Sequence, residues 1–118
     1  KSVKIKPDFW PAINNQGLAY FELNNINLST KHFESAISIE ENAESLLGLA
    51  SCLRIKDINL AIKLTKKALA KDPNYVNYDY RKEQLWGEKL QTSTEILLNN
   101  DELKEDVMLA KSKINEPS

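Results

Sequence analysis

The chain has 118 residues, which is enough for one domain that buries roughly two-thirds of its unfolded surface without disulfides or metals. Sixteen Lys and Arg residues against seventeen Asp and Glu residues give a net charge of −1, so no overall positive field favours nucleic acid. No apolar run approaches the ~18 residues of a membrane span, and a single cysteine, Cys52, excludes an internal disulfide and fits a reducing, cytoplasmic location.

The first residues carry a junction pattern that returns later in the chain. Pro7 stands two positions before Phe9 as Pro73 stands two positions before Tyr75, and an aliphatic residue lies four positions before each proline. We therefore expect residues 1–9 to be the tail of a preceding repeat, cut from a longer array.

Residues 10–42 have the pattern of a helix pair. Pro11 suits the first turn of a helix over residues 10–23, where its missing N–H costs nothing. Asn24 and Asn25 favour a turn. Small and apolar residues then recur at three and four positions over residues 26–40, which predicts an amphipathic helix that packs back on the first.

A second pair follows over residues 43–75. Asn42 and Asp57 are suited to cap helices over residues 43–55 and 58–71, and Pro73 ends the second of them. Small residues recur where two helices would approach to roughly 8–10 Å. They are Gly17, Ala36, Ala50, Ala61 and Ala68.

The last part of the chain, residues 76–115, departs from this pattern. Gly87 is the only helix breaker within 76–98, which we expect to be one long helix. Asn99 and Asn100 predict a turn, and a final amphipathic helix has an apolar stripe made by Leu103, Val107, Ala110 and Ile114. This pair would cap the domain, with residues 116–118 as a frayed tail.

The two pairs share residues at similar offsets with a period of about 33. The first copy has Gly17, Tyr20, Phe33 and Ala36, and the second has Ala50, Leu53, Ala61, Ala68 and Pro73. Residues 1 to about 75 resemble tetratricopeptide repeats on these positions, although several family positions are substituted. The resemblance implies an all-α, right-handed α-solenoid of antiparallel helix pairs, completed here by the capping pair.

Residues with catalytic or metal-binding chemistry do not form a recognisable set. The only histidine, His32, neighbours the core candidate Phe33, where a surface or half-buried role is commoner than a catalytic one. No Ser/His/Asp grouping, Gly-rich phosphate loop or Cys/His spacing is present. We expect no enzyme activity, no cofactor and no metal site.

The resemblance also implies where a partner binds, because the first helices of such pairs line a concave groove. The predicted groove residues are Asn14, Asn15, Leu18, Phe21, Leu47, Ser51, Arg54, Tyr80, Arg81 and Gln84. Ordinary surface or packing between helices is the alternative for each of them. The carboxylate clamp of some family members is incomplete here, since Gly48 and Asn77 occupy two of its places.

Three classes of function follow. The first is a protein–protein interaction scaffold that binds a protein or peptide segment in this groove. The second is the accessory repeat array of a longer, transferase-type enzyme, and the third is a weak self-association module. A basic face made by Lys63, Lys66, Lys67 and Lys71 offers an alternative contact with phosphate groups, although a solvated surface is its commoner meaning.

Overall fold

A computed structural model describes residues 9–114, and within these residues every element is a helix. The α-helices are α1 (Trp10–Glu22), α2 (Ile26–Ile39), α3 (Ala43–Leu53), α4 (Ile58–Lys71), α5 (Tyr78–Glu83), α6 (Glu88–Leu98) and α7 (Lys104–Ile114). Two short 3-10 helices, η1 (Pro73–Val76) and η2 (Asp101–Leu103), precede α5 and α7. The predicted all-α class is confirmed for the described part of the chain. The expectation for residues 1–9 falls almost wholly outside it.

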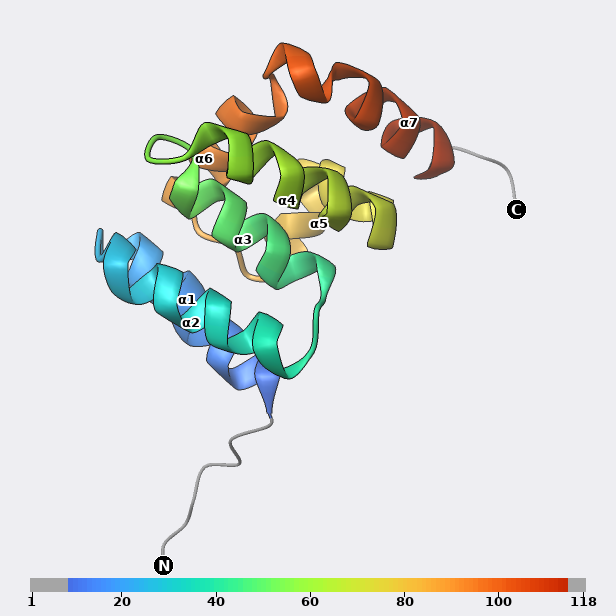
Figure 1. The fold of residues 1–118 in the computed structure, drawn as a ribbon. Coiled ribbons are helices and arrows are strands. Elements are labelled where there is room, and N and C mark those ends of the chain that lie inside the picture. Colours follow the sequence, from blue (N-terminus) through green and yellow to red (C-terminus); the bar gives the residue numbers. More distant parts are fainter. Residues whose placement is uncertain (1–8, 115–118) are drawn as a thin grey trace, which may run out of the picture.

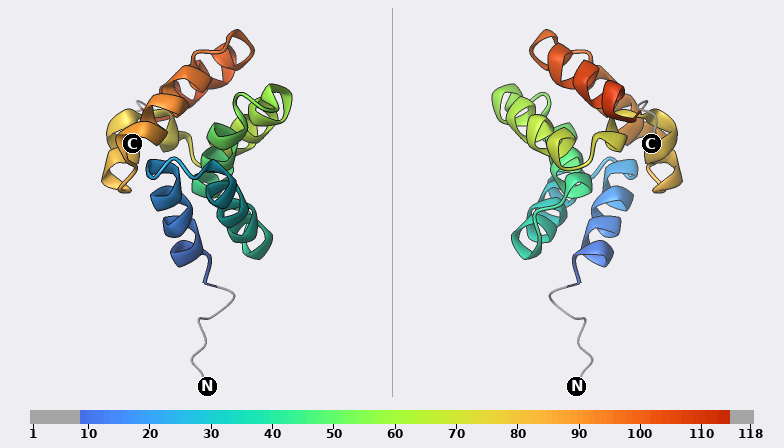
Figure 2. Two further views of the ribbon diagram at one scale, coloured as in Figure 1. Left: turned by 90° about the vertical axis from the view of Figure 1, so that its left-hand side faces the viewer. Right: turned by 90° about the vertical axis from the view of Figure 1, so that its right-hand side faces the viewer.

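The first four helices form two hairpins, α1 with α2 and α3 with α4, and α2 packs on α3 (Figures 1 and 2). Their boundaries follow local chemistry. The side-chain oxygens of Asn25, Asn42 and Asp57 each accept a hydrogen bond from the backbone N–H three residues further on, which satisfies a donor that the first helical turn leaves unpaired. The predicted boundaries of these helices agree with the structure to within two residues.

One aromatic ring lies at the centre of the contacts between the two hairpins. Phe33 of α2 is fully buried, and its ring lies against Gly17 of α1 and Gly48 of α3. A Cβ atom built on either glycine would stand 2.9 Å or 2.6 Å from the ring. The other predicted small residues, Ala36, Ala50, Ala61 and Ala68, are fully buried as expected.

The predicted long helix over residues 76–98 is wrong. The chain instead forms η1 and α5, turns at residues 84–87, and begins α6 at Glu88. Leu85 adopts a left-handed backbone with φ 71°, an uncommon conformation for a residue with a branched side chain. Gly87 is the N-cap of α6, and the carboxylate of Glu22 in α1 accepts hydrogen bonds from the N–H groups of Lys89 and Leu90. A contact with the first helix therefore fixes the start of α6.

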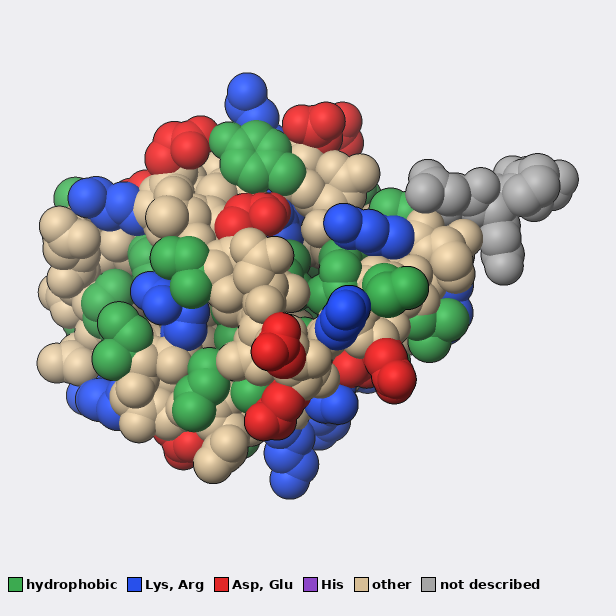
Figure 3. Space-filling model, turned by 90° about the horizontal axis from the view of Figure 1, so that it is seen from above, with side chains coloured by type: hydrophobic (Ala, Val, Ile, Leu, Met, Phe, Trp, Pro, Cys, Tyr) green, Lys and Arg blue, Asp and Glu red, His purple; other side chains and the backbone are tan. Residues whose placement is uncertain are grey.

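The C-terminal helices close the core at the other side of α3 and α4. Leu97 and Leu103 pack with Ala50 and Ala61, while α7 lies against η1 and α4. Figure 3 views the end of the molecule that α7 covers, and hydrophobic side chains there are scattered among acidic and basic ones. The outer surface at this end is therefore mixed in character, with no single continuous apolar or charged patch in this view.

Candidate functional site

The expected partner groove is largely covered by the protein itself, because α6 packs on both α1 and α3. The interface between α6 and α3 contains hydroxyl groups. Ser51 and Thr94 share a hydrogen bond of 2.7 Å, and Ser93 donates to the backbone oxygen of Ser51. Leu90 of α6 is fully buried in the same core cluster as Leu18, Phe21 and Leu47. A partner helix or strand has no access to this part of the surface in the described structure.

The structure accordingly buries most of the predicted groove residues. Those that are buried are Asn14, Leu18, Phe21, Leu47, Ser51 and Arg81. Arg54, Tyr80 and Gln84 are half-buried, and Asn15 is exposed on α1. Leu18, Phe21 and Leu47 share the core cluster, and three of the ten, Phe21, Ser51 and Arg54, line one cavity. The others do not join it.

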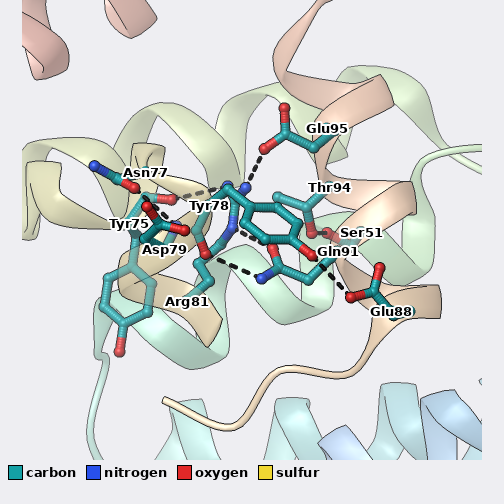
Figure 4. Close-up of polar contacts among 10 residues, drawn as sticks. All are labelled: Ser51, Tyr75, Asn77, Tyr78, Asp79, Arg81, Glu88, Gln91, Thr94 and Glu95. Carbon is teal, nitrogen blue, oxygen red and sulfur yellow. Dashed lines mark hydrogen bonds and ion pairs between the residues drawn. The ribbon is translucent and has the colours of Figure 1, made fainter. Parts of the chain in front are cut away.

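Arg81 has a structural role that the expected long helix concealed. Its guanidinium donates to the Gln91 side chain at 2.7 Å and to the Tyr75 backbone oxygen at 3.0 Å, and it forms an ion pair with Glu95 (Figure 4). Burial lowers the pKa of Arg81, and the nearby Glu95 carboxylate opposes that shift. These bonds tie η1, α5 and α6 together. Sequence spacing alone predicted that this side chain lies on the exposed surface of the groove, where it would contact a partner.

The remaining part of the groove is a cavity of about 270 Å³, which we call the end pocket. It lies between the α1–α2 turn, the last turn of α3 and the first half of α6. Its lining combines apolar side chains with hydroxyls and two cations: Phe21, Asn24, Ile26, Ser51, Cys52, Arg54, Ile55, Lys89, Thr92 and Ser93. Ile55 is 83% exposed at its rim.

Arg54 is oriented within the end pocket by α6. Its Nε–H donates to the Ser93 hydroxyl at 3.1 Å, while no carboxylate of residues 9–114 lies within 4.0 Å of Arg54 or Lys89. The nearby Glu22 carboxylate accepts the two N–H groups that begin α6. The two terminal nitrogens of Arg54 make no hydrogen bond to the described residues, so the guanidinium retains the fork geometry that suits a carboxylate.

The pocket wall also contains the thiol of Cys52. It is half-buried and lies 3.5 Å from the Ser29 hydroxyl, and burial raises its pKa. A thiol with a raised pKa is mostly protonated at neutral pH and is therefore a weak nucleophile. Cys52 thus serves as a small packing residue at the edge of the core.

The other candidates from the sequence are engaged in local contacts. His32 is half-buried, hydrogen-bonds to the Leu28 backbone oxygen and packs on the Tyr20 ring. In the basic face of α4, Lys66 pairs with Asp106 at 3.3 Å, and Lys67 and Lys71 both pair with Glu41. These pairs neutralise much of the face and reduce its attraction for phosphate groups.

A search of the described residues finds no group of three His, Cys, Asp or Glu side chains arranged to hold a metal ion. None of the helices between residues 9 and 114 has the length and apolar character required to cross a membrane. Comparison with known proteins finds no matching family model, no matching curated protein and no matching solved structure.

Proposed function

We propose that this protein is a non-catalytic protein–protein interaction scaffold built from helix pairs of the tetratricopeptide type, and that its partner segment binds at the end pocket. Two helix hairpins packed through small residues support the repeat interpretation. The right-handed solenoid remains part of this proposal. The covered groove confines the binding surface to the end of α3.

The arrangement of Arg54 is the observation that carries the proposal. An arginine that is held at Nε and unpaired at its terminal nitrogens is pre-organised to bind a carboxylate with two parallel hydrogen bonds. Lys89 adds a second cation, and Phe21, Ile26 and Ile55 supply apolar contact area. The pocket therefore fits an acidic side chain of a partner with an aliphatic residue beside it.

Titration of the ¹⁵N-labelled protein with a capped peptide of alternating glutamate and leucine tests this proposal. We expect saturable shifts of the backbone amide signals of Arg54, Lys89 and Ser93. The same peptide with glutamine in place of glutamate should bind at least several-fold more weakly, because it loses the charge-assisted bonds.

Matched variants distinguish specific binding at Arg54 from non-specific attraction between charges. Arg54→Met should remove most of the binding, whereas Lys56→Met removes the same charge from an exposed position nearby and should change it little. Thermal unfolding of both variants checks that the fold is kept. Equal effects of the two substitutions, or equal binding of the two peptides, would refute the proposed site.

A further inference from the structure

A second cavity, of about 400 Å³, lies at the opposite end of α3 from the end pocket. It forms where the α2–α3 connection and the end of α4 meet the start of α1. We call it the acidic pocket, since its lining includes four carboxylates and one lysine: Trp10, Glu40, Glu41, Asn42, Ala43, Glu44, Lys71, Asp72 and Tyr75. It plays no part in the function proposed above.

Three of its charged groups are already engaged. Lys71 lies 3.6 Å from the Glu41 carboxylate, which Lys67 approaches from outside the pocket. Asp72 accepts hydrogen bonds from the backbone N–H of Asn74 and from the Tyr80 hydroxyl. Among the described residues, Lys71 is the only cation that lines the pocket, and it is directed to Glu41 and not to the remaining carboxylates.

Glu44 differs from these groups because it is held only by neutral donors. The Trp86 indole N–H donates to its carboxylate at 2.9 Å, and no Lys or Arg of residues 9–114 lies within 4.0 Å. Burial raises the pKa of Glu44, and the neighbouring Trp86, Asn14 and Tyr75 groups offset only part of that effect. A desolvated carboxylate without a cation is costly, and it faces an open pocket.

A buried N–H donor near the pocket, on the side chain of Asn14, has no acceptor among the described residues. Asn14 is 0% exposed and lies one turn after Trp10 on α1; its side-chain oxygen accepts a hydrogen bond from Ser45 at 2.7 Å. Its amide Nδ2 group makes no hydrogen bond within 3.5 Å to the described residues, although it is near enough to the Glu44 carboxylate to favour its ionised form. A guanidinium has only donors and cannot satisfy this N–H group, so the group that would gain from an arginine bound here is the Glu44 carboxylate, which keeps acceptor capacity beyond the Trp86 bond.

We propose that the acidic pocket binds an arginine side chain of a partner protein. The guanidinium would pair with Glu44, with Glu40 adding negative charge at the rim, and would stack on the half-buried ring of Trp10. Arginine fits better than lysine because its planar, weakly hydrated group combines stacking with bidentate pairing. The proposed ligand here is a cation, whereas the proposed ligand of the end pocket is a carboxylate. The two sites can therefore be tested independently.

The two tryptophans provide the readout, since Trp10 lines the pocket and the Trp86 indole bonds to Glu44. Titration of the ¹⁵N-labelled protein with Nα-acetyl-arginine amide should move both indole N–H signals with one saturable binding curve. Nα-acetyl-lysine amide should bind several-fold more weakly. Equal binding of the two probes, or no movement of the indole signals at millimolar probe, would overturn the assignment.

Two variants test whether Glu44 and Trp10 contribute to arginine binding. Glu44→Gln keeps an oxygen that accepts from Trp86 and should weaken binding by about tenfold, the loss of roughly one partly buried charge pair. Trp10→Leu removes the stacking surface, leaves Trp86 as reporter, and should also weaken binding. Glu34→Gln, at an exposed position outside the pocket lining, is the matched control and should bind like the wild type. Loss of binding in the control, or full binding in both pocket variants, would contradict the proposal.

Discussion

Individual residues of this protein are most constrained around the Phe33 ring. The ring touches helices on both sides, so the glycines that face it are required for close approach and not for backbone freedom. Both glycines lie within regular helices, where a residue other than glycine would ordinarily raise helix propensity. Packing therefore overrides local preference at these positions.

Gly48→Ala is expected to destabilise the fold despite the better helix propensity of alanine. The new Cβ would lie 2.6 Å from the Phe33 ring, and overpacking of this kind typically costs about 1–3 kcal/mol. Urea unfolding followed by circular dichroism measures the loss. Phe33→Leu in the same chain provides more space, so the alanine should cost less in that background. An alanine that stabilises the wild type would contradict this packing argument.

Glu44 predicts a pH dependence of stability with a definite sign. Burial raises its pKa in the folded state above the ordinary value of 4.5, so the native protein holds this proton more tightly than the unfolded chain does. The contribution of Glu44 is most favourable below the unfolded pKa and is lost as pH rises through the folded pKa.

Glu44→Gln should therefore be more stable than the wild type at neutral pH, and this difference should shrink as the pH falls towards 4.5 and below. Denaturant unfolding of both proteins from pH 4 to 8 measures it. The comparison between the two proteins cancels the opposite effect of Glu41, whose pKa is lowered by hydrogen bonding to Lys67. A difference that grows on acidification would show that the sign is wrong.

Among the elements, α6 has its start determined by a distant part of the chain. Gly87 has an ordinary extended backbone, with φ −79° and ψ 171°, so alanine fits its conformation. A Cβ there would stand 2.3 Å from the Glu22 carboxyl carbon, however, and would displace the group that caps α6. The glycine is needed for the cap and not for the turn itself.

Gly87→Ala should accordingly cost about 0.5–2 kcal/mol, the usual loss for a helix N-cap. Glu22→Ala removes the same interaction directly. Because both substitutions act on one contact, their effects in the double variant should fall clearly short of additive. Denaturant unfolding of the four proteins completes this cycle, and strict additivity would contradict the proposed contact.

The comparison of elements also shows what sequence reasoning can predict here. Helices α1 to α4 follow from caps, turn residues and apolar periodicity, all of which are local in the chain. The break before α6 does not follow from these local signals. Leu85 has a left-handed backbone, which is stabilised because Trp86 enters the core and because Glu22, more than sixty residues away, caps α6.

The same dependence on distant residues limited prediction of the proposed binding site. Helix spacing correctly placed Phe21, Ser51 and Arg54 beside one another, because these positions depend on α1 and α3 alone. It assigned Arg81 and Asn14 to an open surface, whereas α6 and α3 cover them. Lys89 and Ser93 were missed, since their place in the end pocket depends on the turn before α6.

At the scale of the whole molecule, α6 changes how the helix pairs depend on one another. In an open repeat array, each pair contacts only its neighbours, and terminal pairs can unfold separately. Here α6 contacts both α1 and α3, and residues from α1, α2, α3 and α6 share one core cluster. The first hairpin and the C-terminal helices should therefore unfold together.

Leu90→Ala tests this coupling, because Leu90 is fully buried where α6 meets the first hairpins. We expect a loss of about 2–5 kcal/mol and a single transition in which circular dichroism and tryptophan fluorescence coincide, as two-state unfolding requires. Leu109→Ala, at a position 57% exposed on α7, should change stability by less than about 0.5 kcal/mol. If Leu90→Ala instead splits the curves, with α1 to α4 retaining the wild-type midpoint, α6 would be a detachable cover over the groove. That result would restore the full groove of α1 and α3 as a binding surface.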